Sequence, residues 1–256
     1  MKAPPPNSAA VATAETDLAR QPRPLWIVKL GGSLAESAQL KAWLALLAAA
    51  AGTTVIVPGG GPFADQVRAA QEQSGFDDAT AHHMALLAME QYGRMLCGLQ
   101  PGLAPTAGLA AIERTRRAGL VPVWMPARLV LSRPEIAATW DITSDSLAAW
   151  LAGALGGRRL LLVKSVDVAG DAVTAAALTR RGIVDPAFPQ FLLRSGSEAW
   201  CIGASRHAEM AAALRGAATA GTRITAPESA RSTSRPIVGH DARANIGADA
   251  VRARQR

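Results

Sequence analysis

The stretch WIVKLGGS, residues 26–33, joins an apolar run, a lysine and a glycine pair. A short apolar run with β-branched side chains that ends at glycine is typical of a buried strand. Lys29 interrupts the run, and an ammonium group in apolar surroundings is costly unless it is paired or binds an anion. The stretch therefore predicts a buried strand whose lysine serves an anion or an ion pair.

A second strand-like run, TTVIVP at 53–58, is followed by Gly59, Gly60 and Gly61, and Pro62 then stands at a favoured helix start. Glycine lets backbone N–H groups approach an anion closely, and a following helix N-terminus adds a favourable dipole. Neither glycine turn fits G-x-x-x-x-G-K-[ST] or G-x-G-x-x-G, which excludes a P-loop ATPase and a Rossmann site. One such turn could serve packing alone, but two at successive strand ends favour phosphate binding.

The rest of the chain alternates between the two kinds of secondary structure. We expect helices at 38–50, 62–73, 78–96 with Asp77 as its cap, 144–157 and 205–216, and further strands at 120–126, 128–132, 159–166, 199–203 and 222–225. Residues 100–119 fit neither pattern clearly. Alternating strands and helices predict a mostly parallel sheet covered on both faces, with ligands bound at the carboxyl ends of the strands.

Four polar residues crowd ahead of the helix at 144–157: Asp141, Thr143, Ser144 and Asp145. One of them is expected to cap the helix. In the functional interpretation, Asp145 faces the crevice and pairs with Lys29 and with Lys164, which closes the apolar run RRLLLVKSVD, while Thr143 or Ser144 contacts phosphate. Two lysines oriented by an aspartate suit phosphoryl transfer, which depends on positioning and charge neutralisation, with magnesium bridging the nucleotide phosphates.

The charge and cysteine content exclude several other classes. The formal net charge is +7, and residues 227–256 contribute to it with six arginines against three acids. A nucleic-acid surface is not indicated, because the body of the chain shows no basic stripe interleaved with aromatics.

No signal peptide or membrane-spanning run is found, and two isolated cysteines favour a reducing cytoplasm. We expect a disordered N-terminal tail at 1–24, one folded domain at 25–226 and a disordered basic tail at 227–256.

Four motifs in order resemble the amino acid kinase superfamily, which includes the acetylglutamate, aspartate, glutamate, carbamate and uridylate kinases. These motifs are IVKLGGS, VIVPGGGPFADQV, DITSDSLAAWLA with LLLVKSVDV, and GTRIT, so the resemblance spans 25–226. It implies a three-layer α/β/α sandwich around a mainly parallel, roughly eight-stranded sheet. It also implies ATP as the phosphoryl donor, Mg²⁺ as the metal, an acceptor on the N-terminal half, nucleotide on the C-terminal half, and a homo-oligomer.

The resemblance also assigns roles to individual residues. Lys29, Asp145 and Lys164 match the catalytic positions, although family members place their second lysine differently. The phosphate and nucleotide would be held by Gly31, Gly32, Ser33, Thr143, Ser144 and Asp167. The acceptor would be held by Gly59, Gly60, Gly61, His82 and His83. Asp77, Asp78 or Glu90 would suit an acceptor amine, and each histidine could equally be a half-buried residue of the helix.

The motifs VPGGGPFAD, AHHMALLAMEQYG and WDITSDSLAAWLA are most similar to the kinases of methanofuran biosynthesis. This branch converts an aminomethyl-furan-methyl phosphate to its diphosphate. Other readings stay open: a uridylate, acetylglutamate or aspartate-type acceptor, or a nucleotide-binding protein of the same fold that stores or senses oxyanions. The stretch 74–90 lacks the arginine with which acetylglutamate kinases grip their substrate. A nucleic-acid binder acting through the arginine-rich tail is the weakest alternative.

Overall fold

The structure is a computed structural model that describes residues 24–157, 159–216 and 220–226. The tails expected to be disordered, 1–24 and 227–256, lie outside the described residues apart from Pro24. Within this part of the chain, no helix is both long and apolar enough to cross a membrane.

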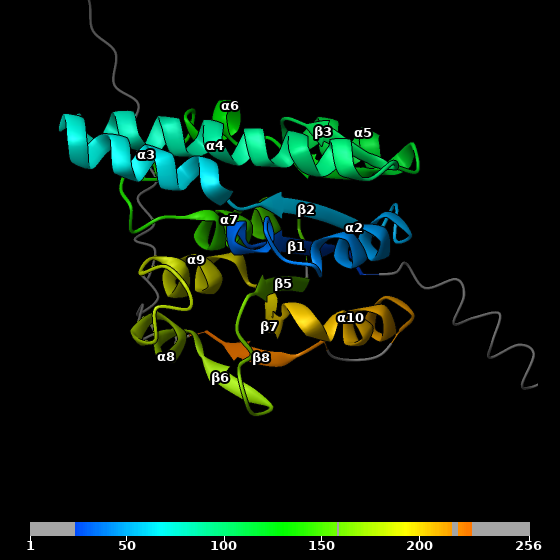
Figure 1. Cartoon of the computed structure of the whole chain (residues 1–256). Helices are drawn as coiled ribbons and strands as arrows, with labels where there is room; N and C mark the ends of the chain where they lie inside the picture. Colours follow the sequence, from blue (N-terminus) through cyan, green and yellow to red (C-terminus); the bar gives the residue numbers. More distant parts are fainter. Residues whose placement is uncertain (1–23, 158, 217–219, 227–256) are drawn as a thin grey trace, which may run out of the picture.

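The described residues form one eight-stranded sheet with the order β3-β4-β2-β1-β5-β7-β8-β6 (Figure 1). The strands are β1 (Trp26–Leu30), β2 (Thr54–Pro58), β3 (Leu103–Thr106), β4 (Val121–Trp124), β5 (Arg159–Lys164), β6 (Ala172–Thr174), β7 (Glu198–Gly203) and β8 (Thr222–Thr225). Every neighbouring pair is parallel except β7 with β8. The predicted α/β fold with a mainly parallel sheet is therefore confirmed.

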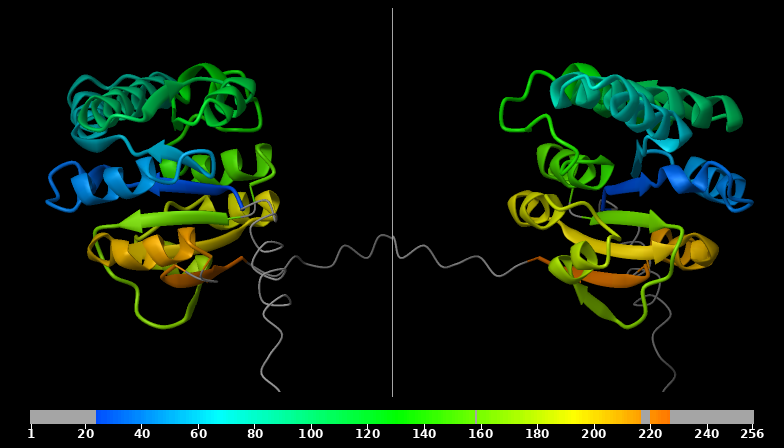
Figure 2. Two further views of the ribbon diagram at one scale, coloured as in Figure 1. Left: turned by 90° about the vertical axis from the view of Figure 1, so that its right-hand side faces the viewer. Right: turned by 60° about the vertical axis from the view of Figure 1, so that its left-hand side comes forward.

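Helices cover both faces of the sheet (Figure 2). They are α2 (Leu40–Ala48), α3 (Gly61–Ser74), α4 (Asp78–Leu99), α5 (Leu109–Arg117), α6 (Ala127–Val130), α7 (Ser144–Ala154), α8 (Ala175–Arg180), α9 (Phe188–Ser195) and α10 (His207–Leu214), with short 3-10 helices η1 (Gly32–Leu34) and η2 (Ala204–Arg206). Successive strand residues face opposite sides. Ile27 thus packs with α7 and α9, whereas Trp26 and Val28 pack with α2 and α10.

One predicted element is wrong, and one ambiguous segment is resolved. The expected strand at 128–132 is the short helix α6, in which the backbone N–H groups of Leu129 and Val130 bond to the carbonyl of Pro126. Proline is common at helix starts, and this turn overrides the apolar, strand-like pattern of the segment. The segment 100–119 contains β3 and α5, and Gly108 begins the helix with a positive φ of 84°.

The strands that carry the predicted site lie side by side. β1 pairs with β2 on one side and with β5 on the other, so their carboxyl ends meet at one edge of the sheet. Two glycine turns touch there: a Cβ at Gly59 would lie 2.5 Å from the amide nitrogen of Gly32, and a Cβ at Gly32 would collide with the backbone of Gly61. Glycine is therefore required by close backbone approach.

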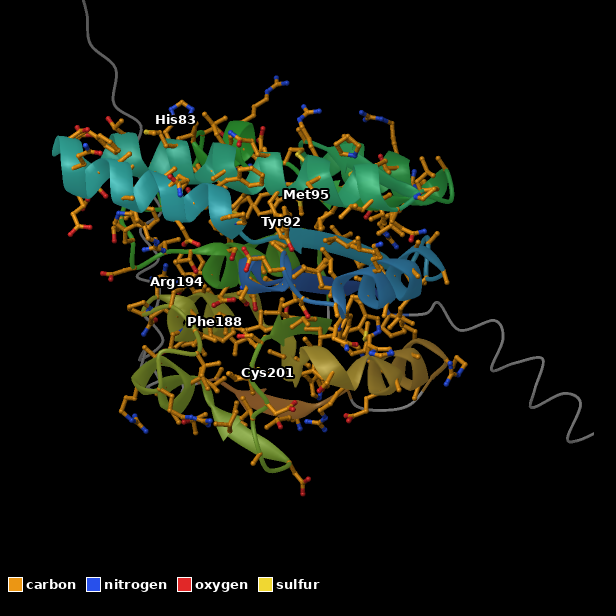
Figure 3. The ribbon with its side chains drawn as sticks, viewed as in Figure 1. His83, Tyr92, Met95, Phe188, Arg194 and Cys201 are labelled. Carbon is orange, nitrogen blue, oxygen red and sulfur yellow. The ribbon has the colours of Figure 1, made fainter. Side chains whose placement is uncertain are left out.

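Tyr92 of α4 packs against the second glycine turn from the side of that helix (Figure 3). Its ring atoms come within 3.3 Å of the position that a Cβ of Gly61 would take. The side chain is fully buried, and burial raises the pKa of its hydroxyl to about 12. Among the described residues, this hydroxyl has no hydrogen-bond partner. The ring therefore contributes packing, while its hydroxyl adds a desolvation cost.

We expect the substitution Tyr92→Phe to keep the free energy of unfolding unchanged or to raise it by about 1 kcal/mol, because it removes an unsatisfied buried hydroxyl. Urea unfolding followed by circular dichroism measures this. Tyr92→Leu is the matched control, which removes the ring and should cost roughly 2 kcal/mol. A loss of more than about 1 kcal/mol in Tyr92→Phe would show that the hydroxyl has a stabilising partner.

Candidate active site

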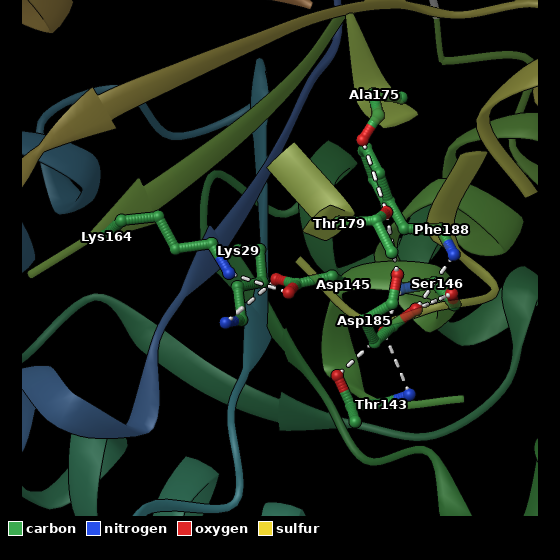
Figure 4. A network of polar contacts seen from close by, with 9 residues as sticks. All are labelled: Lys29, Thr143, Asp145, Ser146, Lys164, Ala175, Thr179, Asp185 and Phe188. Atoms are coloured by element: carbon green, nitrogen blue, oxygen red, sulfur yellow. Dashed lines mark hydrogen bonds and ion pairs between the residues drawn. The ribbon is translucent and has the colours of Figure 1, made fainter. Parts of the chain in front are cut away.

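Three charged side chains from three elements meet at the edge where β1 and β5 end (Figure 4). Asp145, in the first turn of α7, lies 3.0 Å from Lys29 Nζ through Oδ1 and accepts a hydrogen bond of 2.6 Å from Lys164 Nζ through Oδ2. Lys29 and Asp145 are only 6% and 4% exposed. The ion pairs predicted from the sequence are present, and one carboxylate sets the positions of both ammonium groups.

The electrostatics of this cluster follow from burial and pairing. Burial lowers the pKa of Lys29, an effect that Asp145 counters and Lys164 reinforces, and the result lies below the ordinary value. Burial alone would raise the pKa of Asp145, but the two lysines outweigh it and hold that pKa below 3.8. The carboxylate is therefore ionised at neutral pH. The cluster presents a net positive charge to any neighbouring anion.

A cavity of about 310 Å³ opens directly onto the two lysines. Its lining residues are Lys29, Gly31, Gly32, Ser33, Lys164, Ser165, Val166, Arg181, Gly182 and Ile183. Three cations and a glycine turn surround this space, which we call the lysine cavity. The combination of lysine, arginine and accessible backbone is the usual composition of a site for phosphate groups.

A second cavity of about 400 Å³ adjoins the first, and the two share Gly32 and Ser33. Helix α4 supplies one wall through residues spaced by one turn: Asp78, His82, Ala85, Leu86 and Met89. Helix α3 supplies another through Gly61, Pro62, Ala64, Asp65 and Arg68, and the segment before α7 supplies Trp140, Ile142, Thr143 and Ser144. We call this space the helical cavity. Its lining mixes apolar side chains with charged and polar ones.

The predicted acceptor residues separate into two groups. His82 lines the helical cavity and is 6% exposed, and burial, with a smaller effect of His83, lowers its pKa. His83 is exposed on the outer side of α4 and does not reach that cavity (Figure 3). Gly60 and Gly61 line the helical cavity, and Gly59 lies behind them against the turn of β1.

Of the three acids considered for an acceptor amine, only one lines the helical cavity. Asp78 does so, and Gln71 donates a hydrogen bond of 2.9 Å to it. Asp77 instead caps α4 by accepting from the amide of Thr80, as predicted. Glu90 accepts a hydrogen bond of 2.9 Å from the amide of Ala127 and is thereby occupied at the start of α6.

Thr143, Ser144 and Asp167, which the sequence analysis assigned to the nucleotide phosphates, do not line the lysine cavity. Thr143 and Ser144 line the helical cavity rather than the lysine cavity. Asp167 is exposed, 3.9 Å from Arg206, and packs over Gly203 at the end of β7. Their roles toward a nucleotide therefore stay predictions, and none of the three lines the lysine cavity.

Several site residues carry no signal that the sequence analysis used. Arg68 lies 3.9 Å from the ring centroid of Trp140, whose indole N–H donates to Gln71 at 2.7 Å. Arg181 borders the lysine cavity from a loop that follows α8. Asp185 caps α7, a role expected of the residues just before that helix. The α4 spacing of cavity residues was visible in the sequence, whereas contacts across distant loops were not.

We expect Asp145→Asn to lower the free energy of unfolding by about 3 kcal/mol at neutral pH, because it leaves the buried Lys29 and the half-buried Lys164 without a charged partner. The folded pKa of Asp145 is depressed, so this stabilisation is present above pH 3.8 and is lost as the pH falls through the lower folded value. Urea unfolding between pH 7 and pH 3 measures the difference from the parent. It should shrink below about pH 4. Asp171→Asn, at an exposed acid, is the control, and a difference independent of pH would contradict the pairing.

Comparison with known proteins agrees with this geometry. The model of the amino acid kinase family matches residues 24–171. The chain is 28% identical over 194 residues to the [5-(aminomethyl)furan-3-yl]methyl phosphate kinase of Methanocaldococcus jannaschii, covering 72% of this chain and 89% of that protein. Among solved structures, the uridylate kinase of Archaeoglobus fulgidus superposes with a TM-score of 0.61 at 20% identity, over 78% of this chain and all of the other.

An isopentenyl phosphate kinase structure superposes with a TM-score of 0.53 at 18% identity, again over 78% of this chain and all of the other. At these identities the structural likeness establishes the fold. The family match covers more than half of the chain and includes the lysine of β1, both glycine turns, Asp145 and Lys164. This chain therefore belongs to the amino acid kinase family and is a phosphotransferase, as its motifs predicted.

Proposed function

We propose that this enzyme transfers the γ-phosphoryl group of ATP to an acceptor phosphate, and that the acceptor is [5-(aminomethyl)furan-3-yl]methyl phosphate, which becomes the diphosphate in the biosynthesis of a methanofuran-type cofactor. The observation that carries the proposal is the placement of the Lys29–Asp145–Lys164 cluster beside the boundary between two adjoining cavities. The similarity to a kinase of that name supports the acceptor.

The proposed reaction places the ATP phosphates in the lysine cavity and the acceptor in the helical cavity. An oxygen of the acceptor phosphate attacks the γ-phosphorus, the bond from that phosphorus to the bridging β-oxygen breaks, and ADP leaves with the bonding electrons. Lys29 and Lys164 neutralise charge on the transferred group, and Asp145 holds both ammonium groups in position. Such positioning and charge stabilisation are the main requirements of phosphoryl transfer.

The helical cavity suits a small acceptor with charges of opposite sign at its ends. The first turn of α3, at Gly61 and Pro62, lines the cavity and offers a helix N-terminus to a phosphate. Leu86, Met89 and Ile142 supply apolar walls for a ring. Asp65, about 6 Å further along the axis of α3 from Gly61, and Asp78 supply carboxylates for an amine.

We propose Mg²⁺ as the companion of ATP. Among the described residues, no group of three or more His, Cys, Asp or Glu side chains is arranged to hold a metal ion. Magnesium commonly binds through substrate phosphates with few protein ligands, and we propose that it enters on the nucleotide. When bound, it would neutralise charge on the β- and γ-phosphates beside the lysine cavity.

The kinase domain is proposed to span 25–226, with the acceptor on its N-terminal half and nucleotide on its C-terminal half. A homo-oligomer is proposed, and the exposed leucines Leu87 and Leu99 of α4 support it as candidates for an interface. The cytoplasm is the proposed compartment, supported by the free thiols of Cys97 and Cys201, and the partners are small molecules rather than nucleic acid or membrane.

The test is ADP release with Mg·ATP and a panel of acceptors: the furan phosphate, uridylate, acetylglutamate, aspartate and carbamate. We expect release with the furan phosphate alone. Lys29→Ala should lower kcat at least about 100-fold because a cation on the transferred group is lost, while Lys41→Ala, at an exposed lysine of α2, should change it little. Release with another acceptor would overturn the substrate. Undiminished turnover in Lys29→Ala would overturn the mechanism.

A second variant tests which cavity holds the acceptor. We expect Ala85→Phe to raise the KM for the acceptor at least about tenfold, because a phenyl group would fill part of the helical cavity, and to leave ATP affinity unchanged. Steady-state kinetics and calorimetric titration with ATP measure the two effects. Ala79→Phe makes the same change at an exposed position of α4 that does not line the cavity. Weaker ATP binding in Ala85→Phe would reverse the assignment of the two cavities.

A further inference from the structure

Asp185, in the loop between α8 and α9, accepts hydrogen bonds from several groups. Its side chain is buried and accepts from two segments of the chain (Figure 4). Oδ2 accepts from the amide and the hydroxyl of Thr143, at 2.9 and 2.7 Å, and from the amide of Ser146 at 3.1 Å. Oδ1 accepts from the Ser146 hydroxyl and from the amide of Phe188 at 2.8 Å.

These bonds make one carboxylate the cap of two helices. The first turn of α7 receives no side-chain cap from its own N-cap residue, Thr143, and Ala187 has no group with which to cap α9. Asp185 supplies the missing acceptor to both helices. Orphan amides at helix starts are costly when buried, so this residue fixes α7 and α9 relative to each other at their N-terminal ends.

The position of this cap connects it to the reacting groups. Asp145, which orients both lysines, lies between Thr143, the N-cap of α7, and Ser146 in its first turn, and Asp185 bonds to both of these residues. On the other side, residues 181–183, two to four positions before Asp185, line the lysine cavity. A shift of Asp185 would therefore move the carboxylate that holds the lysines and one wall of the proposed phosphate site together.

Capping a single helix would not require an acid at this position. Asp185 is a second buried acid, and burial together with the charge of Asp145 raises its pKa. A serine or asparagine could cap one helix without this cost. Only a carboxylate, with two oxygens that both accept, satisfies the donors of both helices at once.

We propose that Asp185 is a positioning residue for phosphoryl transfer: it fixes Asp145, and through it Lys29 and Lys164, against the 181–183 wall of the lysine cavity. Its expected effect on kcat rests on the proposed function, whereas its expected effect on the position of the Asp145 carboxylate does not. It assigns the residue a role beyond the stability of a helix end.

The test compares Asp185→Asn, Asp145→Asn and the double variant. Asparagine keeps the size of the side chain, but its amide NH₂ would face an N–H donor in either orientation. We expect Asp185→Asn to lower kcat about tenfold or more with KM values for ATP and acceptor within about threefold, because an indirect effect on transition-state stabilisation appears in kcat. In the Asp145→Asn background, Asp185→Asn should lower kcat by less than about a further threefold, since both substitutions act through the Asp145 carboxylate.

The control is Thr174→Ala, which removes the cap of α8, a hydrogen bond of 3.1 Å from the amide of Ala177. It should lower the melting temperature without lowering kcat per folded molecule. Ser146→Ala removes the hydroxyl donor to Asp185 Oδ1 and keeps the bond from the Ser146 amide. It should lower kcat less than Asp185→Asn does, and it replaces Asp185→Asn in the test if that variant does not fold. Fully multiplicative effects in the double variant, or an unchanged kcat per folded molecule in Asp185→Asn or its substitute, would overturn the proposal.

A crystal structure separates this proposal from the proposed function. If the parent transfers phosphate to no acceptor in the panel, the function fails, yet the structure of Asp185→Asn, or of Ser146→Ala in its place, should still show the Asp145 carboxylate displaced from at least one lysine. Thr174→Ala should show both ion pairs intact. Undisturbed ion pairs in the variant at the Asp185 cap would overturn the positioning role regardless of turnover.

Discussion

The buried carboxylate of Asp145, shared by Lys29 and Lys164, is the interaction on which the rest of the site depends. Each of these charges would be costly to bury alone, and truncating one member leaves the others unpaired. The sheet brings them together because β1 and β5 are parallel neighbours and α7 begins at the same edge. The excess positive charge of the cluster is available to an anion that enters from solvent.

Packing and chemistry share the same backbone around this cluster. The turns after β1 and β2 touch through glycines, and both turns face a cavity. Tyr92 packs against the turn after β2 at Gly61. Asp185 then ties the start of α7 to the start of α9. The site is thus held by regular elements and their ends, which place side chains more precisely than free loops do.

The local sequence pattern was sufficient to predict the elements and caps that depend on neighbouring residues. The strands at β1, β2 and β5, the glycine turns and the capping of α4 by Asp77 are visible as periodicity and turn chemistry. The strand expected at 128–132 is a helix because its short apolar run, Leu129–Leu131, does not distinguish a strand from the turn that starts at Pro126. Asp185 was missed because it lies about forty residues from Thr143, and no pattern within α7 shows that its cap comes from elsewhere.

The contact between the two glycine turns also bears on how such a site could change during evolution. A methyl group added to Gly32 would displace the turn at Gly61, so neither turn is free to accept a substitution while the other stays in place. Asp65, Arg68 and His82, which line the helical cavity from later turns of α3 and from α4, take no part in this contact between the glycine turns. New acceptors are therefore accessible through successive single substitutions on the helices, with the phosphate-handling turns inherited as one unit.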